Sequence, residues 1–90
     1  MVKEIEKPVG KVSTNQEELK KLILFNDDVN TFEFVIDSLI EVCEHNPMQA
    51  ENCAMITHFK GRCPVMSGSF KDLEPYHKAL SKRQLTVEIS

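Results

Sequence analysis

The sequence lacks the surplus of positive charge by which proteins attract nucleic acids. Its 11 Lys and Arg residues are outnumbered by 14 Asp and Glu residues, so the net charge is −3. Phosphate backbones are held mainly by positive side chains. The basic residues are also scattered along the chain, with no aromatic residues between them as stacking platforms. We therefore expect no nucleic-acid binding.

Glycine is also scarce. Gly10, Gly61 and Gly68 are the only three glycines, and they are too dispersed for a phosphate-binding loop. No nucleophile elbow or zinc-protease helix occurs either. Two adjacent carboxylates, Asp27 and Asp28, rarely aim at one substrate atom. The sequence therefore predicts a protein that is not an enzyme and that has no cofactor.

The three cysteines, Cys43, Cys53 and Cys63, lack C-x-x-C spacing, and each lies in or beside an apolar run. This pattern favours free, buried thiols. A zinc site could recruit Cys43, His45, Cys53 or His58. Helical spacing brings together only residues three or four apart, so it pairs His45 with neither of these thiols. We expect no metal site, although a metal-linked or redox-linked regulator built on these thiols remains an alternative.

No apolar run has the roughly 20 residues that a membrane-spanning helix needs. The N-terminus also lacks the apolar core of a secretion signal. We expect a cytoplasmic protein that does not enter membranes. At 90 residues, the chain has room for one small domain. Residues 1–18 show no periodic pattern and predict a flexible N-terminal extension, and residues 19–90 predict a single domain.

In the first half of the domain, the apolar run 22–25 predicts a short buried strand. Asn30 followed by Glu33 resembles a capping box and predicts a helix over about residues 31–44. Asn46, with Pro47 directly after it, predicts the start of a second helix. Gly61 predicts that this helix ends near Lys60.

In the second half, residues 63–66 predict a weak strand, which Pro64 restricts to a sheet edge or a strand start. Ser69 or Asp72 can cap a third helix. We favour Asp72, because Pro75 then falls in the first helical turn. The alternation over residues 85–89 predicts a half-buried last strand. The predicted order is β-α-α-β-α-β, an α/β fold of the α+β sandwich type, with three helices on one face of a three-stranded, mainly antiparallel sheet.

The turn Asn26-Asp27-Asp28 places polar acceptors next to an apolar strand, with Phe32 and Phe34 close behind. Such a turn suits a small cation with an apolar tail, although strand termination and helix capping explain the same residues. Ala54, Thr57 and His58 share one helix face. If this face lies beside the turn, the imidazole and the acidic turn suit an ammonium group. A core or interface histidine remains the alternative for His58.

Three segments together resemble the ClpS family of protease adaptors: residues 24–28 (LFNDD), residues 32–36 (FEFVI) and residues 58–61 (HFKG). The resemblance covers residues 20–90. It implies an adaptor that binds N-degron substrates, which bear a free bulky hydrophobic N-terminal residue. It also implies that the adaptor delivers them to the AAA+ unfoldase of the Clp protease, through the N-terminal domain of the unfoldase.

Carried over residue by residue, the resemblance implies two groups of site residues. Those for the substrate α-amine are Asn26, Asp27, Asp28 and His58. Those for the hydrophobic pocket are Asn30, Thr31, Phe32, Val35, Ala54, Thr57 and Leu85. Phe32 would stand at the pocket mouth, and the small Ala54 and Thr57 would make the pocket deeper or more polar. The alternative is a domain like the C-terminal domain of the ribosomal stalk protein, which has a similar fold but no amine pocket.

Overall fold

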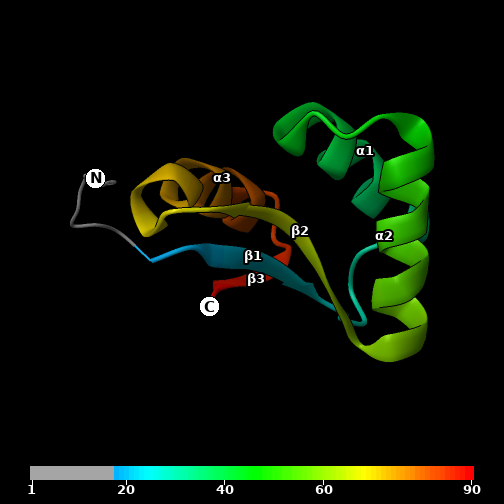
Figure 1. Cartoon of the computed structure of the whole chain (residues 1–90). Coiled ribbons are helices and arrows are strands. Elements are labelled where there is room, and N and C mark those ends of the chain that lie inside the picture. The colour runs from blue at the N-terminus through cyan, green and yellow to red at the C-terminus, as the bar shows by residue number, and fades with distance from the viewer. Residues whose placement is uncertain (1–17) are drawn as a thin grey trace, which may run out of the picture.

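The computed structural model describes residues 18–90 of the chain. Residues 1–17, which make up nearly all of the predicted extension, lie outside the described residues. The elements in chain order are β1 (Lys20–Phe25), α1 (Phe32–Cys43), α2 (Pro47–Lys60), β2 (Arg62–Gly68), α3 (Phe70–Lys82) and β3 (Thr86–Ile89). This order confirms the predicted β-α-α-β-α-β arrangement (Figure 1).

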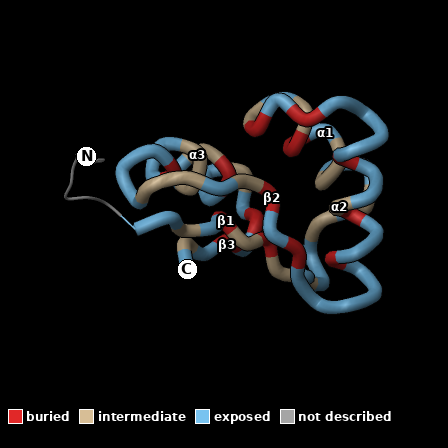
Figure 2. Tube along the Cα trace, viewed as in Figure 1, coloured by how far each residue is buried: buried red, intermediate tan, exposed pale blue. Residues whose placement is uncertain are grey.

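The sheet has the strand order β2-β1-β3, and both pairings are antiparallel. Leu22 and Leu24 of the central strand point to the same face and are almost completely buried. They form one core with Leu39 of α1, Ala50 of α2 and Leu80 of α3. Since each helix contributes to this core, the three helices cover the apolar face of the sheet. The buried residues in Figure 2 accordingly lie where the strands and helices meet.

The edge strand β2 is longer than predicted and contains a bulge. Ile23 pairs with Pro64 while Leu22 pairs with Met66, so Val65 has no partner in the register. Pro64 has no N–H to donate and is therefore tolerated at this edge, as predicted. The carbonyl of Val65 accepts a hydrogen bond of 2.8 Å from Nε2 of the buried His45. The bulge is thus tied to the segment between α1 and α2.

The predicted start of α1 is wrong by one residue. Thr31 is the N-cap, and its hydroxyl accepts a hydrogen bond from the N–H of Phe34. Asn30 is not the cap; its side-chain amide instead donates to Asp27 and to the carbonyl of Gln84. Glu33 therefore does not occupy the third helical position, and the expected capping box does not form.

The preference for Asp72 as the cap of α3 is also wrong. Ser69 is the N-cap, and its hydroxyl accepts a hydrogen bond from the N–H of Asp72. Pro75 consequently lies inside the helix, where it removes the hydrogen bond to the carbonyl of Lys71. Both residues are exposed, so water can replace the lost partner. The exposed position therefore reduces the cost of a proline inside the helix.

The predicted boundaries of α2 are confirmed. The side chain of Asn46 accepts a hydrogen bond of 2.8 Å from the N–H of Gln49, and Pro47 is the first helical residue. Gly61 ends the helix with φ at +94°. The alternation of the last strand is also confirmed, since Val87 is buried between two exposed residues. Across residues 18–90, none of the helices is long and apolar enough to cross a membrane.

We predict that Gly61→Ala lowers the free energy of unfolding by about 1–2 kcal/mol, the usual cost of a left-handed conformation for a residue with a Cβ atom. No heavy atom lies within 4 Å of the position that the new Cβ would take, so the cost comes from the backbone alone. Gly61→Asn is the matched control, because asparagine tolerates this conformation better. Urea denaturation measures both variants. Equal stability of Gly61→Ala and the wild type would contradict the prediction.

Candidate functional site

The turn after β1 lies directly beside the C-terminal end of α2. The N–H of Asn26 donates a hydrogen bond of 2.9 Å to the carbonyl of Gly61. This bond joins the turn to the helix end that carries His58. A cavity of about 380 Å³ opens at this junction. Its lining residues are Leu24, Phe25, Asn26, Asp27, Asp28, Asn30, Phe32, Val35, Ala54, Thr57, His58 and Leu85.

All the predicted site residues line this cavity except Thr31. Thr31 instead caps α1 through its hydroxyl, as described above. The sequence analysis missed two lining residues, Leu24 and Phe25. A signal for them was available, because they immediately precede Asn26 and end the strand that leads into the turn. The residues named from sequence thus come together in space, while their roles in binding remain proposals.

The cavity is apolar where it is buried and polar where it is exposed. Leu24, Ala54 and Leu85 are each at most 4% exposed and form its interior. Asn26, Asp28 and His58 are exposed. Such an arrangement suits a ligand with an apolar group that enters and a polar group that remains at the rim.

Thr57 makes the interior less polar than its residue type suggests. It is buried, and its hydroxyl donates a hydrogen bond of 2.8 Å to the backbone carbonyl of Cys53. The hydroxyl proton is therefore used within α2. This contact counts against the more polar pocket that the sequence allowed.

Asp27 holds the turn in shape. Its Oδ1 accepts hydrogen bonds of 2.9 Å from the N–H groups of Val29 and Asn30, and its Oδ2 accepts one of 2.9 Å from the Asn30 side chain. Burial raises the pKa of the Asp27 carboxyl, but these hydrogen bonds from Asn30 and Val29 outweigh it, so the pKa lies below its ordinary value. Asp27 is therefore a charged structural residue at neutral pH.

Asp28 and His58 keep their polar atoms available. Neither side chain has a hydrogen-bond partner among residues 18–90, and both are exposed at the cavity. The His58 ring packs edge-on against Phe59, with ring centroids 5.1 Å apart and planes at 75°. A carboxylate and an imidazole nitrogen that are both free to accept can share the donors of one ammonium group.

The three cysteines are free thiols and do not line the cavity. Burial, together with the neighbouring Cys53, raises the pKa of Cys43 to about 11 and that of Cys63 to about 11. Protonated thiols are poor nucleophiles and poor metal ligands. No group of three or more His, Cys, Asp or Glu side chains within residues 18–90 could hold a metal ion. The sequence spacing did not reveal that Cys53 lies next to both other thiols.

Comparisons with known proteins agree on one family. The model of the family described as ATP-dependent Clp protease adaptor protein ClpS matches residues 15–88. The fold is similar to the solved structure of Agrobacterium tumefaciens ClpS2 bound to L-phenylalaninamide, with a TM-score of 0.75 and 25% sequence identity. That likeness covers 83% of this chain and 98% of the other. No curated protein matches the chain.

We predict that the carboxyl of Asp27 has a pKa below the ordinary aspartate value of about 3.9, and that Asn30→Ala raises it by removing one hydrogen bond. A lowered pKa means that the folded state favours the charged form. The stabilisation from Asp27 is therefore complete above about pH 4 and is lost as the pH falls through the folded-state pKa. Carboxyl chemical shifts followed by NMR measure this titration. Val29→Ala keeps its backbone N–H and should leave the pKa unchanged; an equal shift in both variants would refute this account.

Proposed function

The chain belongs to the ClpS family of ATP-dependent Clp protease adaptors, and we propose that its cavity binds the free N-terminal residue of proteins destined for that protease. The protein is an adaptor and not a protease. One observation carries the proposal: a cavity with a buried apolar interior opens beside exposed acceptor groups. The ligand of the similar ClpS2 structure, L-phenylalaninamide, has this chemistry, with a free α-amine and one apolar side chain.

We assign recognition of the α-amine to Asn26, Asp28 and His58. An ammonium group has three donors, and an amide oxygen, a carboxylate and a neutral imidazole nitrogen are three acceptors. Asp28 supplies the charge that compensates the cation. Asp27 contributes indirectly, because its oxygens already accept hydrogen bonds that shape the turn. The two neighbouring carboxylates thus have different roles.

We assign the N-terminal side chain to the apolar interior formed by Leu24, Val35, Ala54 and Leu85. Burying one large apolar side chain contributes about 1.5–3 kcal/mol. Each charge-assisted hydrogen bond at the rim contributes a further ~1.5–3 kcal/mol. These gains are offset by the loss of freedom on association. The balance corresponds to a dissociation constant of roughly micromolar size, weak enough for a substrate to be passed on.

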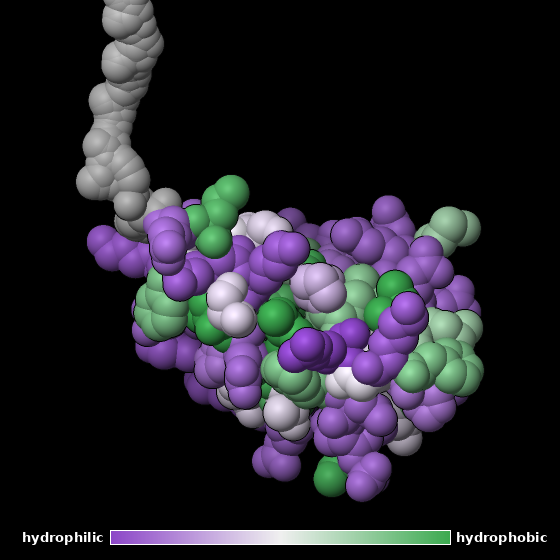
Figure 3. All heavy atoms as spheres, turned by 60° about the horizontal axis from the view of Figure 1, so that its bottom comes forward, coloured by the Kyte–Doolittle hydropathy of each residue, from purple (hydrophilic) through white to green (hydrophobic). Residues whose placement is uncertain are grey.

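We further propose that the partner in delivery is the N-terminal domain of the AAA+ unfoldase and that the protein acts in the cytoplasm. The family membership supports both proposals. The cavity lies at one end of the domain, where β1 and α2 end, so most of the remaining surface stays free for the partner. Figure 3 shows one face of this surface, on which hydrophobic side chains form separate groups between polar ones. No observation favours the alternative of a stalk-like domain without an amine pocket.

We predict that acetylation of a Leu-initiated or Phe-initiated peptide weakens its binding by about 100-fold or more, because it removes the cation and two charge-assisted hydrogen bonds. Calorimetry with free and acetylated peptides measures the difference. Asp28→Asn should also weaken binding of the free peptides. Glu33→Gln removes an exposed carboxylate outside the cavity and is the matched control. Equal binding of free and acetylated peptides would overturn the proposed function.

We predict that His58→Ala weakens the binding of free-amine peptides severalfold, because it removes one acceptor for the substrate amine. His58→Gln keeps an acceptor on the side chain and should therefore lose less affinity than His58→Ala. Calorimetry at neutral pH measures both variants. Equal binding by the wild type and His58→Ala would remove His58 from this role.

A further inference from the structure

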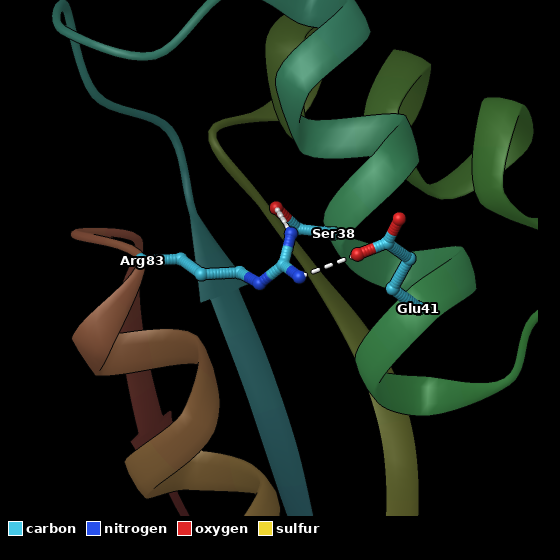
Figure 4. A network of polar contacts seen from close by, with 3 residues as sticks. All are labelled: Ser38, Glu41 and Arg83. Atoms are coloured by element: carbon cyan, nitrogen blue, oxygen red, sulfur yellow. Dashed lines mark hydrogen bonds and ion pairs between the residues drawn. The ribbon is translucent and has the colours of Figure 1, made fainter.

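The connection between α3 and β3 is bonded to two parts of the molecule that contribute residues to the cavity, α1 and the site turn. Arg83 reaches across to α1, where Nη1 donates to the hydroxyl of Ser38 at 3.3 Å and Nη2 contacts Glu41 at 2.6 Å. Figure 4 shows the side chain of Arg83 reaching from the end of α3 to Ser38 and Glu41 of α1. The carbonyl of the next residue, Gln84, accepts a hydrogen bond of 2.9 Å from the Asn30 side chain of the site turn.

The backbone of this connection has little freedom to move. The N–H of Arg83 donates to the carbonyl of Leu80, and the N–H of Leu85 donates to the same carbonyl. Between them, Gln84 adopts a left-handed conformation with φ at +69° and donates its N–H to Ser81. Because Leu85 lines the cavity, the position of Arg83 is coupled to that of the cavity wall.

Another part of the cavity wall belongs to α1. Val35 lines the cavity and lies one helical turn before Ser38, the residue that Arg83 contacts. Ser38 is completely buried, and within residues 18–90 the only side chain that bonds its hydroxyl is that of Arg83. A buried hydroxyl without a partner is unfavourable. The planar guanidinium of Arg83 is therefore held where it contacts both Ser38 and Glu41.

We infer that Arg83 is a positioning residue for ligand specificity: through Ser38 and Glu41 it fixes the distance between the α1 wall and Leu85, and so the width of the cavity. This inference rests on the proposed function. Arg83 does not line the cavity. Without the guanidinium, α1 and Leu85 can move apart. The wider cavity then fits a leucine side chain less closely, and this loss is greater than for a larger aromatic side chain.

The test is the ratio of the dissociation constants for Leu-initiated and Phe-initiated peptides, measured by calorimetry at neutral pH. Arg83→Lys keeps the charge but loses the planar fork. We expect it to weaken Leu binding by about fivefold, a change within the range that pocket fit controls, and Phe binding by less. In the double variant Glu41→Arg/Arg83→Glu, the new carboxylate can accept from Ser38 and pair with the new guanidinium. The ratio should return toward that of the wild type.

Ile89→Ala controls for a general loss of stability. Ile89 packs on the core at the other end of β3 and does not line the cavity, so this variant should lower stability without changing the ratio. An unchanged ratio in Arg83→Lys, with wild-type binding intact, would overturn the inference and leave the proposed function standing. Failure of the wild type to bind either free-amine peptide would overturn the proposed function itself.

Discussion

The site depends on one backbone hydrogen bond, between the N–H of Asn26 and the carbonyl of Gly61. It brings the end of the central strand to the end of α2, so that an acidic turn and His58 border the same cavity. The bond requires α2 to stop at a residue that tolerates positive φ, which Gly61 does without strain. A local conformational property of one glycine thus helps to bring groups about thirty residues apart in sequence to one cavity.

A hydrogen-bonded turn supports the exposed polar groups at this cavity. Asp27 uses its oxygens to close the turn, and Asn30 ties the turn to the connection after α3. Asp28 and His58, by contrast, keep their polar atoms open at the surface. A ligand that brings its own donors therefore meets acceptors whose positions are already set, and little freedom of the protein is lost on binding. This division suits the proposed recognition of an amine by a small domain.

The capping errors show where sequence reasoning reached its limit. Asn30 and Thr31 are both good N-cap residues. The local sequence does not show which of the two side chains forms a tertiary hydrogen bond and which caps the helix. The side chain of Asn30 donates a hydrogen bond to the carbonyl of Gln84, which follows it by 54 residues in the chain. In α3, Pro75 lies inside the helix at a place where both the proline and the carbonyl it leaves unpaired are exposed. In each case the deciding factor was a tertiary contact or the exposure of a helix face.

The sequence by itself determined the elements and their order, because apolar periodicity, Asn46-Pro47 and Gly61 act within a few residues of chain. It also contained most residues of the candidate site, which a family resemblance picked out. Only the tertiary structure decided that all of them except Thr31 share one cavity with Leu24 and Phe25, that Asp27 is structural while Asp28 is free, and that Arg83 contacts α1. Those outcomes depend on distances between segments remote in sequence, and such distances are set by how the helices pack on the sheet.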